Sequence, residues 1–360
     1  MSRVRARGEE IRRFILNHVQ ANPGNITKLA MERFGITRQA VNSHLHRLVA
    51  EGALQEKGKT RSRSYQLALI LEWRQRYPIS SGPAEDVVWR NDIAPVLGKL
   101  PENISDIWSY GFTEMFNNAR DHSGGTSILV SITKTAATTE MLIMDDGVGI
   151  FRKIQAALNL LDERHAIFEL SKGKLTTDPA RHTGEGIFFT SRVFDGFDIL
   201  SGGVFFSHQF GDKEDWLLER TNPANGTSVF MKLNNHTART TKKIFDQYTA
   251  TDDDMAFNKT VVPVHLAQYG NDKLISRSQA KRVLARVDLF KKVILDFRDV
   301  QTIGQAFSDE MFRVFVREHP GIELVPIHTN SEVKRMILRA KTAGLEASPS
   351  PSAPSPDEDE

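Results

Sequence analysis

The stretch MLIMDDGVGIF, Met141–Phe151, places four apolar residues directly before two acids and two glycines. An apolar run bounded by glycines predicts a strand, and Asp145 and Asp146 then stand at its exit. Gly147 and Gly149 permit backbone conformations that bulkier residues disfavour. The stretch therefore predicts a carboxylate at the end of a strand, where it could serve catalysis, a metal ion or ligand binding.

The sequence before this strand predicts a helix with one polar row. Glu114 and Asn118 are four residues apart, so on a helix they lie one above the other. An unpaired polar group that is buried costs roughly 1–3 kcal/mol, and a bound ligand would satisfy it. The core face of this helix has apolar residues at helical spacing, namely Ile104, Ile107, Trp108, Phe112, Met115 and Ala119.

Two glycine motifs follow the strand. Gly184 and Gly186 precede a helix that is predicted over residues 187–194. Glycines at a helix start let backbone N–H groups approach a phosphate closely, and the helix dipole adds to the attraction. Further on, NGT at residues 225–227 predicts a turn that leads into another strand.

Taken in order, E-x-x-x-N on a helix, D-x-G-x-G after a strand, G-x-G before a helix and G-T before a strand resemble the GHKL ATPase family. This family includes the ATP-binding domains of sensor histidine kinases, gyrase, the MutL repair proteins and the anti-sigma-factor kinases. The resemblance covers residues 101–236 and implies a two-layer α/β sandwich of the Bergerat type. It implies ATP and Mg2+ as the cofactors.

The resemblance assigns the metal ligand and the catalytic acid to the predicted helix. It implies that Asn118 coordinates the Mg2+ that bridges the phosphates, since Mg2+ takes oxygen ligands and an amide oxygen qualifies. It implies that Glu114 orients and deprotonates the attacking water in an ATPase. In a kinase of the family, an acceptor side chain replaces that water.

The strand exit matches the part of the family that binds the base. Asp145 corresponds to the residue that accepts a hydrogen bond from the adenine amino group, and Thr227 is expected to support it. Gly147 and Gly149 would allow the backbone to approach the base and the ribose. Asp146 is expected to make local turn contacts and no chemistry.

The phosphates are assigned to the second glycine motif. The resemblance implies that Gly184 and Gly186 border the phosphates at the end of a mobile lid. Three basic residues of this lid are candidates for meeting the phosphate charge, and the sequence does not choose among them: Lys172, Lys174 and Arg181.

The N-terminal part of the chain is strongly basic. Residues 1–70 contain 13 Lys or Arg and 5 Asp or Glu, a local net charge of +8, whereas the whole chain carries +2. Such a surface suits a polyanion. A helix predicted over residues 37–51 begins at Thr37, a natural N-cap. The segment 6–68 resembles a winged helix-turn-helix of bacterial transcription regulators, and we assign residues 1–70 to this domain.

The exposed side of that helix and the hairpin after it carry the candidate contacts to double-stranded DNA. Their side chains can hydrogen-bond base edges or phosphates. The alternative is that the basic surface is only solvated and that the module mediates protein contacts. The candidate DNA-binding residues are Gln39, Asn42, Ser43, His46, Arg47, Lys59 and Arg61.

Strands and helices alternate over residues 258–344, which predicts a small α/β domain. Within it, VILDFRDVQTIGQAF at 293–307 resembles the STAS fold of anti-sigma-factor antagonists, in which a loop presents a phosphorylatable Ser. This sequence has Gly304 near that point, and Ser308 lies one helical turn further in. We therefore expect a STAS-like domain that docks a protein partner.

Two other segments are expected to be less regular. Residues 71–100 are predicted to be a connector, because YPISSGPAED lacks a helical or strand period. Residues 345–360 alternate Pro and Ser before a run of acids, which predicts a disordered acidic tail.

Length and composition limit the class of protein. A chain of 360 residues with 40% hydrophobic content predicts several domains. Because there is no cysteine, disulfides, thiolate zinc sites and cysteine nucleophiles are excluded. No apolar run approaches the roughly 20 residues of a membrane span, so we expect a cytoplasmic protein without a membrane partner.

Three functions fit these patterns. The leading hypothesis is a DNA-binding regulator of transcription whose GHKL-type domain is a nucleotide switch with weak Mg2+-dependent ATPase activity. The first alternative is a Ser/Thr protein kinase of the anti-sigma-factor type that acts on a STAS-like partner, and the second is a non-catalytic nucleotide-binding scaffold. The sequence leaves open whether the chain forms a homodimer.

Overall fold

The computed structural model forms two compact units. The first comprises Met1–Arg164 and Phe189–Ile244, and the second comprises His165–Phe188 and Phe245–Glu360. Most of the segment that was expected to be the lid therefore belongs to the same unit as the C-terminal domain. The structure describes residues 3–59, 62–176, 183–211, 216–249, 256–268 and 273–346.

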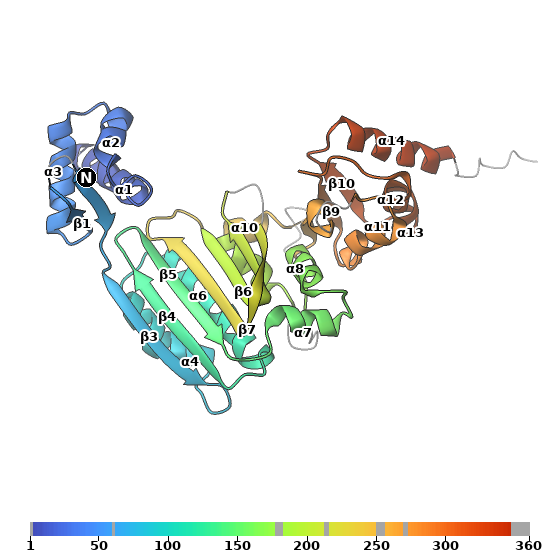
Figure 1. Ribbon diagram of the computed structural model, residues 1–360, viewed down its shortest axis with the longest axis horizontal. Coiled ribbons are helices and arrows are strands. Elements are labelled where there is room, and N and C mark those ends of the chain that lie inside the picture. The colour runs from blue at the N-terminus through green and yellow to red at the C-terminus, as the bar shows by residue number, and fades with distance from the viewer. Residues whose placement is uncertain are drawn as a thin grey trace, which may run out of the picture. The chain divides into compact units, whose positions relative to one another are not determined.

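Three helices and a two-stranded hairpin begin the first unit (Figure 1). Their core is one apolar cluster that includes Ile15, Val19, Val41 and Leu45, all fully buried. The elements are α1 (Arg3–His18), α2 (Ile26–Phe34), α3 (Arg38–Ala50), β1 (Leu54–Lys57) and β2 (Ser64–Leu67).

Two residues between α2 and α3, Gly35 and Thr37, set the boundary between these helices. Gly35 ends α2 in the left-handed conformation, with φ of 61°, and its N–H bonds to the carbonyl of Met31. Thr37 then caps α3 as predicted, because its side chain accepts a hydrogen bond from the N–H of Ala40 at 3.3 Å. A Gly and a Thr two residues apart thus make a tight turn between the helices.

A five-stranded antiparallel sheet forms the rest of the first unit. The register aligns Val130, Ile143 and Val229 in one buried row across three neighbouring strands. Figure 1 shows α4 (Glu85–Val88) and α6 (Glu102–Asn117) on one side of this sheet. From one edge to the other, the strands are β3 (Leu71–Pro78), β4 (Ser127–Lys134), β5 (Thr138–Asp145), β7 (Trp216–Asn234) and β6 (Gly196–Gln209).

Residues 71–100 are not an irregular connector, which corrects the sequence prediction. Their first eight residues are the edge strand β3, which pairs with β4 along its whole length. Leu71, Trp73 and Tyr77 alternate with polar residues, and this strand period was overlooked because a Pro- and Gly-containing turn follows it. The remaining elements of the segment are α4, the π-helical turn η2 (Trp89–Ile93) and α5 (Ala94–Leu97).

Aromatic side chains of α6 form the core of this unit. Trp108 packs against Phe194 with ring centroids 4.8 Å apart, and Phe112 lies 5.2 Å from Phe116. Such pairs contribute about 0.5–1.5 kcal/mol beyond the area that they bury. Gly111 makes room for the Phe194 ring, because a Cβ at this position would lie 2.4 Å from it.

The second unit contains a parallel three-stranded sheet in the order β10-β9-β8. Helices connect the parallel strands, which confirms the α/β prediction for this part of the chain. The strands are β8 (Lys259–Pro263), β9 (Lys292–Asp296) and β10 (Glu323–Ile327), and the helices around them include α11 (Arg277–Leu284), α12 (Gln305–Asp309), the π-helical turn η6 (Glu310–Phe315), α13 (Val316–Glu318) and α14 (Ser331–Glu346).

Four further helices follow the sheet strands of the first unit or lead into the second: α7 (Ile150–Ala157), α8 (Glu163–Lys172), α9 (Gly186–Val193) and α10 (Thr241–Asp246). Of the predicted acidic tail, residues 345 and 346 end α14, and the rest lies outside the described residues. In the described part of the chain, no helix has both the length and the apolar character that a bilayer span requires.

A buried charge cluster fixes the end of α8 in the second unit. The Lys172 side chain is fully buried, and its Nζ lies 2.7 Å from Glu169 Oε1. The same Nζ donates to the carbonyls of Arg282 and Ala285 at 3.1 and 2.9 Å, just at the end of α11. Burial lowers the pKa of Lys172 to about 8, although the Glu169 carboxylate favours the charged form.

Arg286 completes the cluster from the other side of Glu169. Its Nη1 lies 3.1 Å from Glu169 Oε2, and its Nη2 donates to the carbonyl of Gly173 at 3.2 Å and to that of Lys174. In addition, Thr260 Oγ1 of β8 donates to the Lys172 carbonyl at 2.6 Å. Residues 169–174 are therefore a structural part of the C-terminal unit.

Replacing Glu169 by Gln should strongly destabilise the second unit. The change leaves the buried Lys172 and the half-buried Arg286 without an anion between them, and breaking a buried pair in this way costs about 3–5 kcal/mol. Urea unfolding at neutral pH measures the loss. Glu323→Gln is the matched control, because its pair with Lys292 at 2.9 Å is exposed and worth about 0–1 kcal/mol. Equal losses in the two variants would contradict the prediction.

Candidate functional site

The carboxylate of Asp145 ends strand β5, as the sequence predicts. Its Oδ1 accepts hydrogen bonds from the N–H of Gly147 at 2.9 Å and of Thr227 at 3.2 Å. Asp145 is only 7% exposed, and burial raises the pKa of its carboxyl group against the effect of those two N–H groups. Within the described residues, Oδ2 accepts no hydrogen bond from another residue, so one oxygen remains available to a ligand.

Thr227 supports the strand end from β7. While its backbone N–H binds Asp145, its Oγ1 accepts the N–H of Ile150 at 3.0 Å. Ser201 of β6 lies beside it, with Oγ 3.3 Å from Thr227 Oγ1 and 3.1 Å from the carbonyl oxygen of Gly226. Sequence reasoning missed Ser201, because only the pairing of β6 with β7 brings it here.

Asp146 makes structural contacts, as expected. Its carboxylate accepts hydrogen bonds from the backbone N–H and the hydroxyl of both Thr126 and Ser127, at 2.6–3.0 Å. These bonds hold the pKa of Asp146 well below its usual range. Asp146 thereby fixes the start of β4 against the end of β5, and the two neighbouring acids have different roles.

The two glycines after these acids are required by the packing of the protein itself. A Cβ on Gly147 would lie 2.2 Å from the carbonyl oxygen of Ser123. Gly149 has φ of +99°, and a Cβ there would lie 2.8 Å from Ser201 Oγ. This packing is sufficient to explain both glycines, and their expected approach to the base and the ribose stays a prediction.

Glu114 and Asn118 share one side of α6. The backbone N–H of Asn118 bonds to the carbonyl of Glu114 one turn earlier, and both side chains are half-buried. Asn118 is also the first residue of η3 (Asn118–His122), a π-helical turn. Interruptions of this kind in an α-helix are frequent at functional sites.

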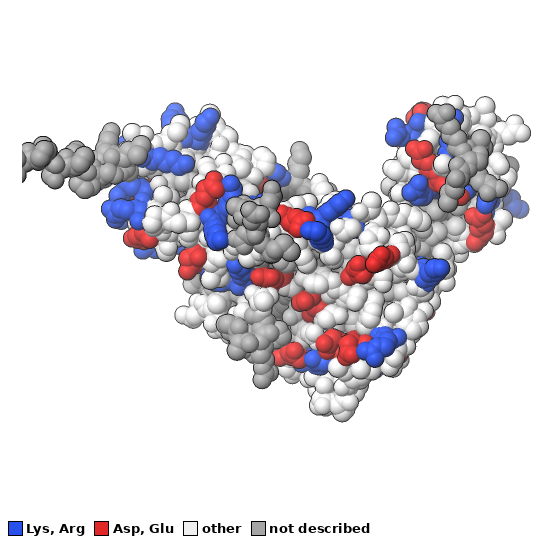
Figure 2. All heavy atoms as spheres, turned by 180° about the vertical axis from the view of Figure 1, so that it is seen from behind, with Lys and Arg blue, Asp and Glu red and all other residues white. Residues whose placement is uncertain are grey.

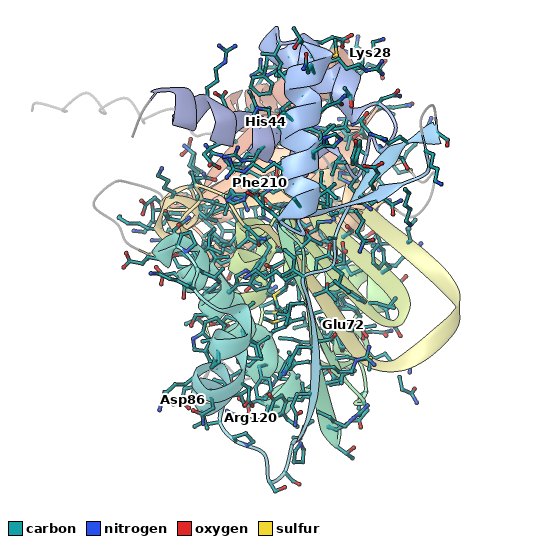
Figure 3. All side chains as sticks on the ribbon, turned by 90° about the vertical axis from the view of Figure 1, so that its left-hand side faces the viewer. Lys28, His44, Glu72, Asp86, Arg120 and Phe210 are labelled. Carbon is teal, nitrogen blue, oxygen red and sulfur yellow. The ribbon has the colours of Figure 1, made fainter. Side chains whose placement is uncertain are left out.

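Hydrogen bonds join η3 to the loop after β5. The N–H of Val148 donates to the carbonyl of Ser123 at 3.0 Å, and Lys153 Nζ of α7 donates to the carbonyl of His122 at 2.7 Å. On the other side of η3, Arg120 pairs with Glu85 of α4 at 3.0 Å. Figure 3 labels Arg120 and, on α4, Asp86. The structure therefore brings the end of the Glu114 helix next to the Asp145 loop. Lys153 had no signal in the sequence pattern.

Gly184 and Gly186 belong to the second unit, so the structure does not place them relative to Asp145. Gly184 has φ of +73°, and its carbonyl accepts the N–H of Leu175 at 3.0 Å. A Cβ on Gly184 would lie 2.5 Å from the backbone of Leu175. Gly186 begins α9, which agrees with a helix predicted directly after this motif.

One of the lid lysines, Lys172, is not free to meet phosphate charge, which corrects the sequence prediction for that residue. Lys172 is fully buried in its pair with Glu169, and Lys174 Nζ donates to the carbonyl of Leu289 at 3.0 Å. The burial of Lys172 could not be predicted from the sequence, because a sequence does not distinguish a buried Lys from an exposed one. Arg181, the third candidate, lies outside the described residues.

The oxygen donors of the first unit suit a metal ion that arrives with a nucleotide. In the described ranges, no group of three or more His, Cys, Asp or Glu could hold a metal ion. A Mg2+ ion bound to phosphates needs only one or two protein oxygens, and the amide of Asn118 can supply one. Among the described residues, the neighbouring Asn117 Oδ1 is buried and finds no hydrogen-bond partner at this end of α6.

The candidate DNA contacts are mostly exposed. The side chains of Gln39, Ser43 and His46 are exposed on α3, whereas Asn42 is half-buried. Figure 2 shows acidic side chains interspersed with basic ones on the visible face of this helical part.

The three basic residues among the candidate DNA contacts differ in their surroundings. Arg47 is already paired, with its Nε 2.7 Å from Glu51 Oε1. Lys59 is exposed in the segment after β1, and Arg61 lies outside the described residues. Of the predicted cations, Lys59 is the better candidate for a phosphate contact.

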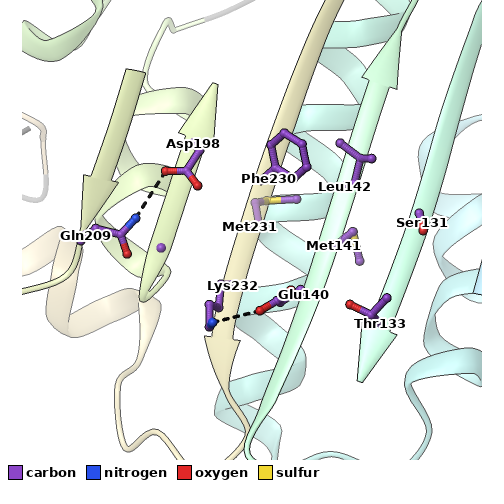
Figure 4. Close-up of a pocket in the computed structure, with 11 residues that line it drawn as sticks. Ser131, Thr133, Glu140, Met141, Leu142, Asp198, Gln209, Phe230, Met231 and Lys232 are labelled. Atoms are coloured by element: carbon purple, nitrogen blue, oxygen red, sulfur yellow. Dashed lines mark hydrogen bonds and ion pairs between the residues drawn. The ribbon is translucent and has the colours of Figure 1, made fainter. Parts of the chain in front are cut away.

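A separate cavity of about 470 Å3 lies over the sheet strands β4 to β7 (Figure 4). An ion pair between Glu140 and Lys232 at 2.9 Å and a hydrogen bond from Gln209 to Asp198 at 3.3 Å line it, together with the exposed ring of Phe230. None of the sequence-predicted site residues lines this cavity.

Ser308 of the second unit is inaccessible. It is 1% exposed, and its Oγ donates to the carbonyl of Met336 at 2.9 Å. A kinase would therefore find no accessible hydroxyl here in the folded domain.

Comparison with known proteins bears on the second unit. A family model described as a STAS-like domain of unknown function (DUF4325) matches residues 279–334. The match spans β9, β10 and the helical turns between them, so the C-terminal domain is STAS-like, as the sequence predicts. A comparison with curated proteins gives no match.

Proposed function

We propose that this chain is a DNA-binding regulatory protein in which an ATP-binding domain of the GHKL type acts as a nucleotide switch. The N-terminal helices and hairpin would bind double-stranded DNA in the manner of a winged helix. The sheet domain would bind ATP, and the STAS-like domain would dock a protein partner. The observation that carries the proposal is the geometry of Asp145.

A carboxylate with one free oxygen suits the adenine base. Asp145 Oδ1 is held by two backbone N–H groups, so the position of Oδ2 is fixed before any ligand arrives. Oδ2 is a hydrogen-bond acceptor in a largely buried place, and an exocyclic amino group is the donor that it would select.

The hydrolytic step would depend on α6. Asn118 would hold the metal ion through its amide oxygen, and Glu114 would accept the proton of a water molecule one turn away. Mg2+ bound with the nucleotide would neutralise the charge that develops on the transferred phosphoryl group. Glu114 is half-buried, so its side chain as a whole is not shut off from solvent.

Ser308 does not favour the protein-kinase alternative, because it is buried. Incubation with γ-labelled ATP and Mg2+ separates the three functions. Free phosphate supports the switch with ATPase activity, labelled protein supports the kinase, and nucleotide binding without either product supports a scaffold.

Replacing Asp145 by Asn should change the choice of base. The Asn side chain can still accept the N–H groups of Gly147 and Thr227, but it presents an NH2 donor where Oδ2 now stands. Affinity for ATP should fall at least about tenfold, or 1.4 kcal/mol. ITP has a carbonyl in place of the adenine amino group and should bind the variant better than ATP does.

Isothermal titration with both nucleotides measures this exchange. Asp106→Asn, on the exposed side of α6, is the control and should bind ATP like the unmodified chain. If Asp145→Asn binds ATP with unchanged affinity, Asp145 does not contact the base.

Replacing Glu114 by Gln should abolish turnover and spare binding. The amide keeps the shape of the side chain but cannot take a proton, and loss of a general base costs typically 10²–10⁴-fold in rate. Phosphate release and nucleotide affinity should be measured on the same preparation. Glu102→Gln, exposed in the first turn of the same helix, should retain normal turnover. Normal hydrolysis by Glu114→Gln would show that this assignment is wrong.

Replacing Lys59 by Ala should weaken DNA binding about equally for all sequences. A lost phosphate contact also lowers the dependence of log K on log salt by about one unit, because one fewer counterion is released. Fluorescence anisotropy with a mixed-sequence duplex over a salt series measures both quantities. Lys232→Ala removes the same charge from the sheet and should leave DNA binding unchanged. Binding that is insensitive to salt would leave the N-terminal domain as a protein-interaction module.

A further inference from the structure

The hairpin that joins β4 to β5 ends inside the hydrophobic core of the N-terminal helices. Ala137, at its tip, is 2% exposed and belongs to the same buried cluster as Ile15, Val19 and Leu45. Ala136 packs against this cluster as a partly buried residue. The sheet thus contributes side chains to the core around which α1, α2 and α3 fold.

Hydrogen bonds make the tip of this hairpin rigid. Thr135 Oγ1 accepts the N–H groups of Ala137 and Thr138 at 3.2 and 3.0 Å, which closes the turn from inside. Asn235 spans the turn, because its Nδ2 donates to the Thr135 carbonyl at 2.9 Å and its N–H donates to the Ala137 carbonyl at 2.8 Å. Thr139 Oγ1, which is fully buried, donates to Asn235 Oδ1 at 2.7 Å.

A second contact joins the same end of the sheet to α1. Asn234, the last residue of β7, donates from Nδ2 to Asn17 Oδ1 at 2.9 Å. Both β5 and β7 therefore have one end against the N-terminal helices. At the candidate nucleotide site, Asp145 is the other end of β5, and Thr227 lies within β7.

The connection between these ends is short and stiff. Strand β5 has eight residues from the hairpin tip to Asp145, a distance of roughly 25 Å at about 3.4 Å per residue. Thr139, Met141 and Ile143 point into the core along its length and are each at most 1% exposed. Its neighbours β4 and β7 pair with it along nearly all of it, so its two ends cannot move independently without breaking sheet hydrogen bonds.

Helices α1 and α3 link the hairpin tip to the candidate DNA-binding residues on α3. Helix α1, which Asn17 ties to the sheet, packs against α3. Val41 and Leu45 of α3 share the core with Ala137, while Gln39 and Ser43 are exposed on the same helix. A shift of the hairpin tip therefore has to be accommodated by the core that positions α3, because close-packed cores do not deform freely.

We infer that nucleotide at Asp145 and DNA at α3 are thermodynamically coupled through β5, β7 and the hairpin tip 135–138. This inference rests on the proposed function and specifies how the switch is transmitted. Binding of either ligand changes the affinity for the other by the same factor, since coupling between two binding sites is reciprocal. The C-terminal unit is not required for this coupling.

The test measures the affinity of the full chain for a fluorescent mixed-sequence DNA duplex, without nucleotide and with saturating Mg2+ and a non-hydrolysable ATP analogue. The affinity for the analogue is measured with and without the duplex. The two ratios should agree and differ from one by at least about fivefold, the lower end of typical coupling.

Two variants test the route. Ala136→Gly with Ala137→Gly removes the two methyl groups that enter the core, and Asn17→Ala removes the hydrogen bond to Asn234. Each variant should bind nucleotide alone and DNA alone within about twofold of the unmodified chain, while the coupling factor falls toward one. Asn17 is exposed, so its variant remains informative if the double-glycine variant does not fold.

The matched control is Glu140→Ala, which removes an exposed side chain from the middle of β5 and should leave the coupling unchanged. The inference is overturned if both ligands bind and the coupling factor of the unmodified chain is one. It is also overturned if both variants retain the full factor. Absence of nucleotide binding in the unmodified chain is a different result, because it refutes the proposed function itself.

Discussion

The first unit depends on one buried carboxylate, that of Asp145, which the backbone holds through one of its two oxygens. Asp145 Oδ1 accepts the N–H of Gly147 in the loop after β5 and the N–H of Thr227 in β7, which fixes the end of β5 against β7 and sets the path of the chain that follows. Ionised carboxylates are expensive to bury, so a site of this kind persists only when donors surround it. The carboxylate of Asp146 is exposed, and it binds the start of β4 through backbone N–H groups as well. Two adjacent acids thus fix the end of β5 and the start of β4.

Much of this arrangement was accessible from the sequence, because its signals are local. The apolar run before Asp145 predicted β5, the spacing from Ile104 to Ala119 predicted α6, and Thr37 marked the start of α3. The different roles of Asp145 and Asp146 were also anticipated. For the C-terminal domain, alternating strands and helices indicated the α/β fold, and the family match agrees with it.

Other features could not be predicted, because they arise from contacts between distant segments. Ser201 comes to Thr227 only through the pairing of β6 with β7. The role of Lys172 depends on Arg286, which lies in another domain of the predicted scheme. Strand β3 is a different case, because its alternation of apolar and polar residues is present in the sequence. The Pro- and Gly-containing turn after it favoured the prediction of a connector.

The Lys172 cluster has a consequence for how the chain can be divided. A fragment that ends after β7 would contain Glu169 and Lys172 but neither Arg286 nor the carbonyls at the end of α11 that bind the ammonium group. Such a fragment would expose apolar α8 residues such as Ile167 and Phe168, which are buried in the intact chain. The sheet domain and the STAS-like domain are therefore not interchangeable modules, and recombination or gene fusion at residue 236 would separate a helix from the domain that stabilises it.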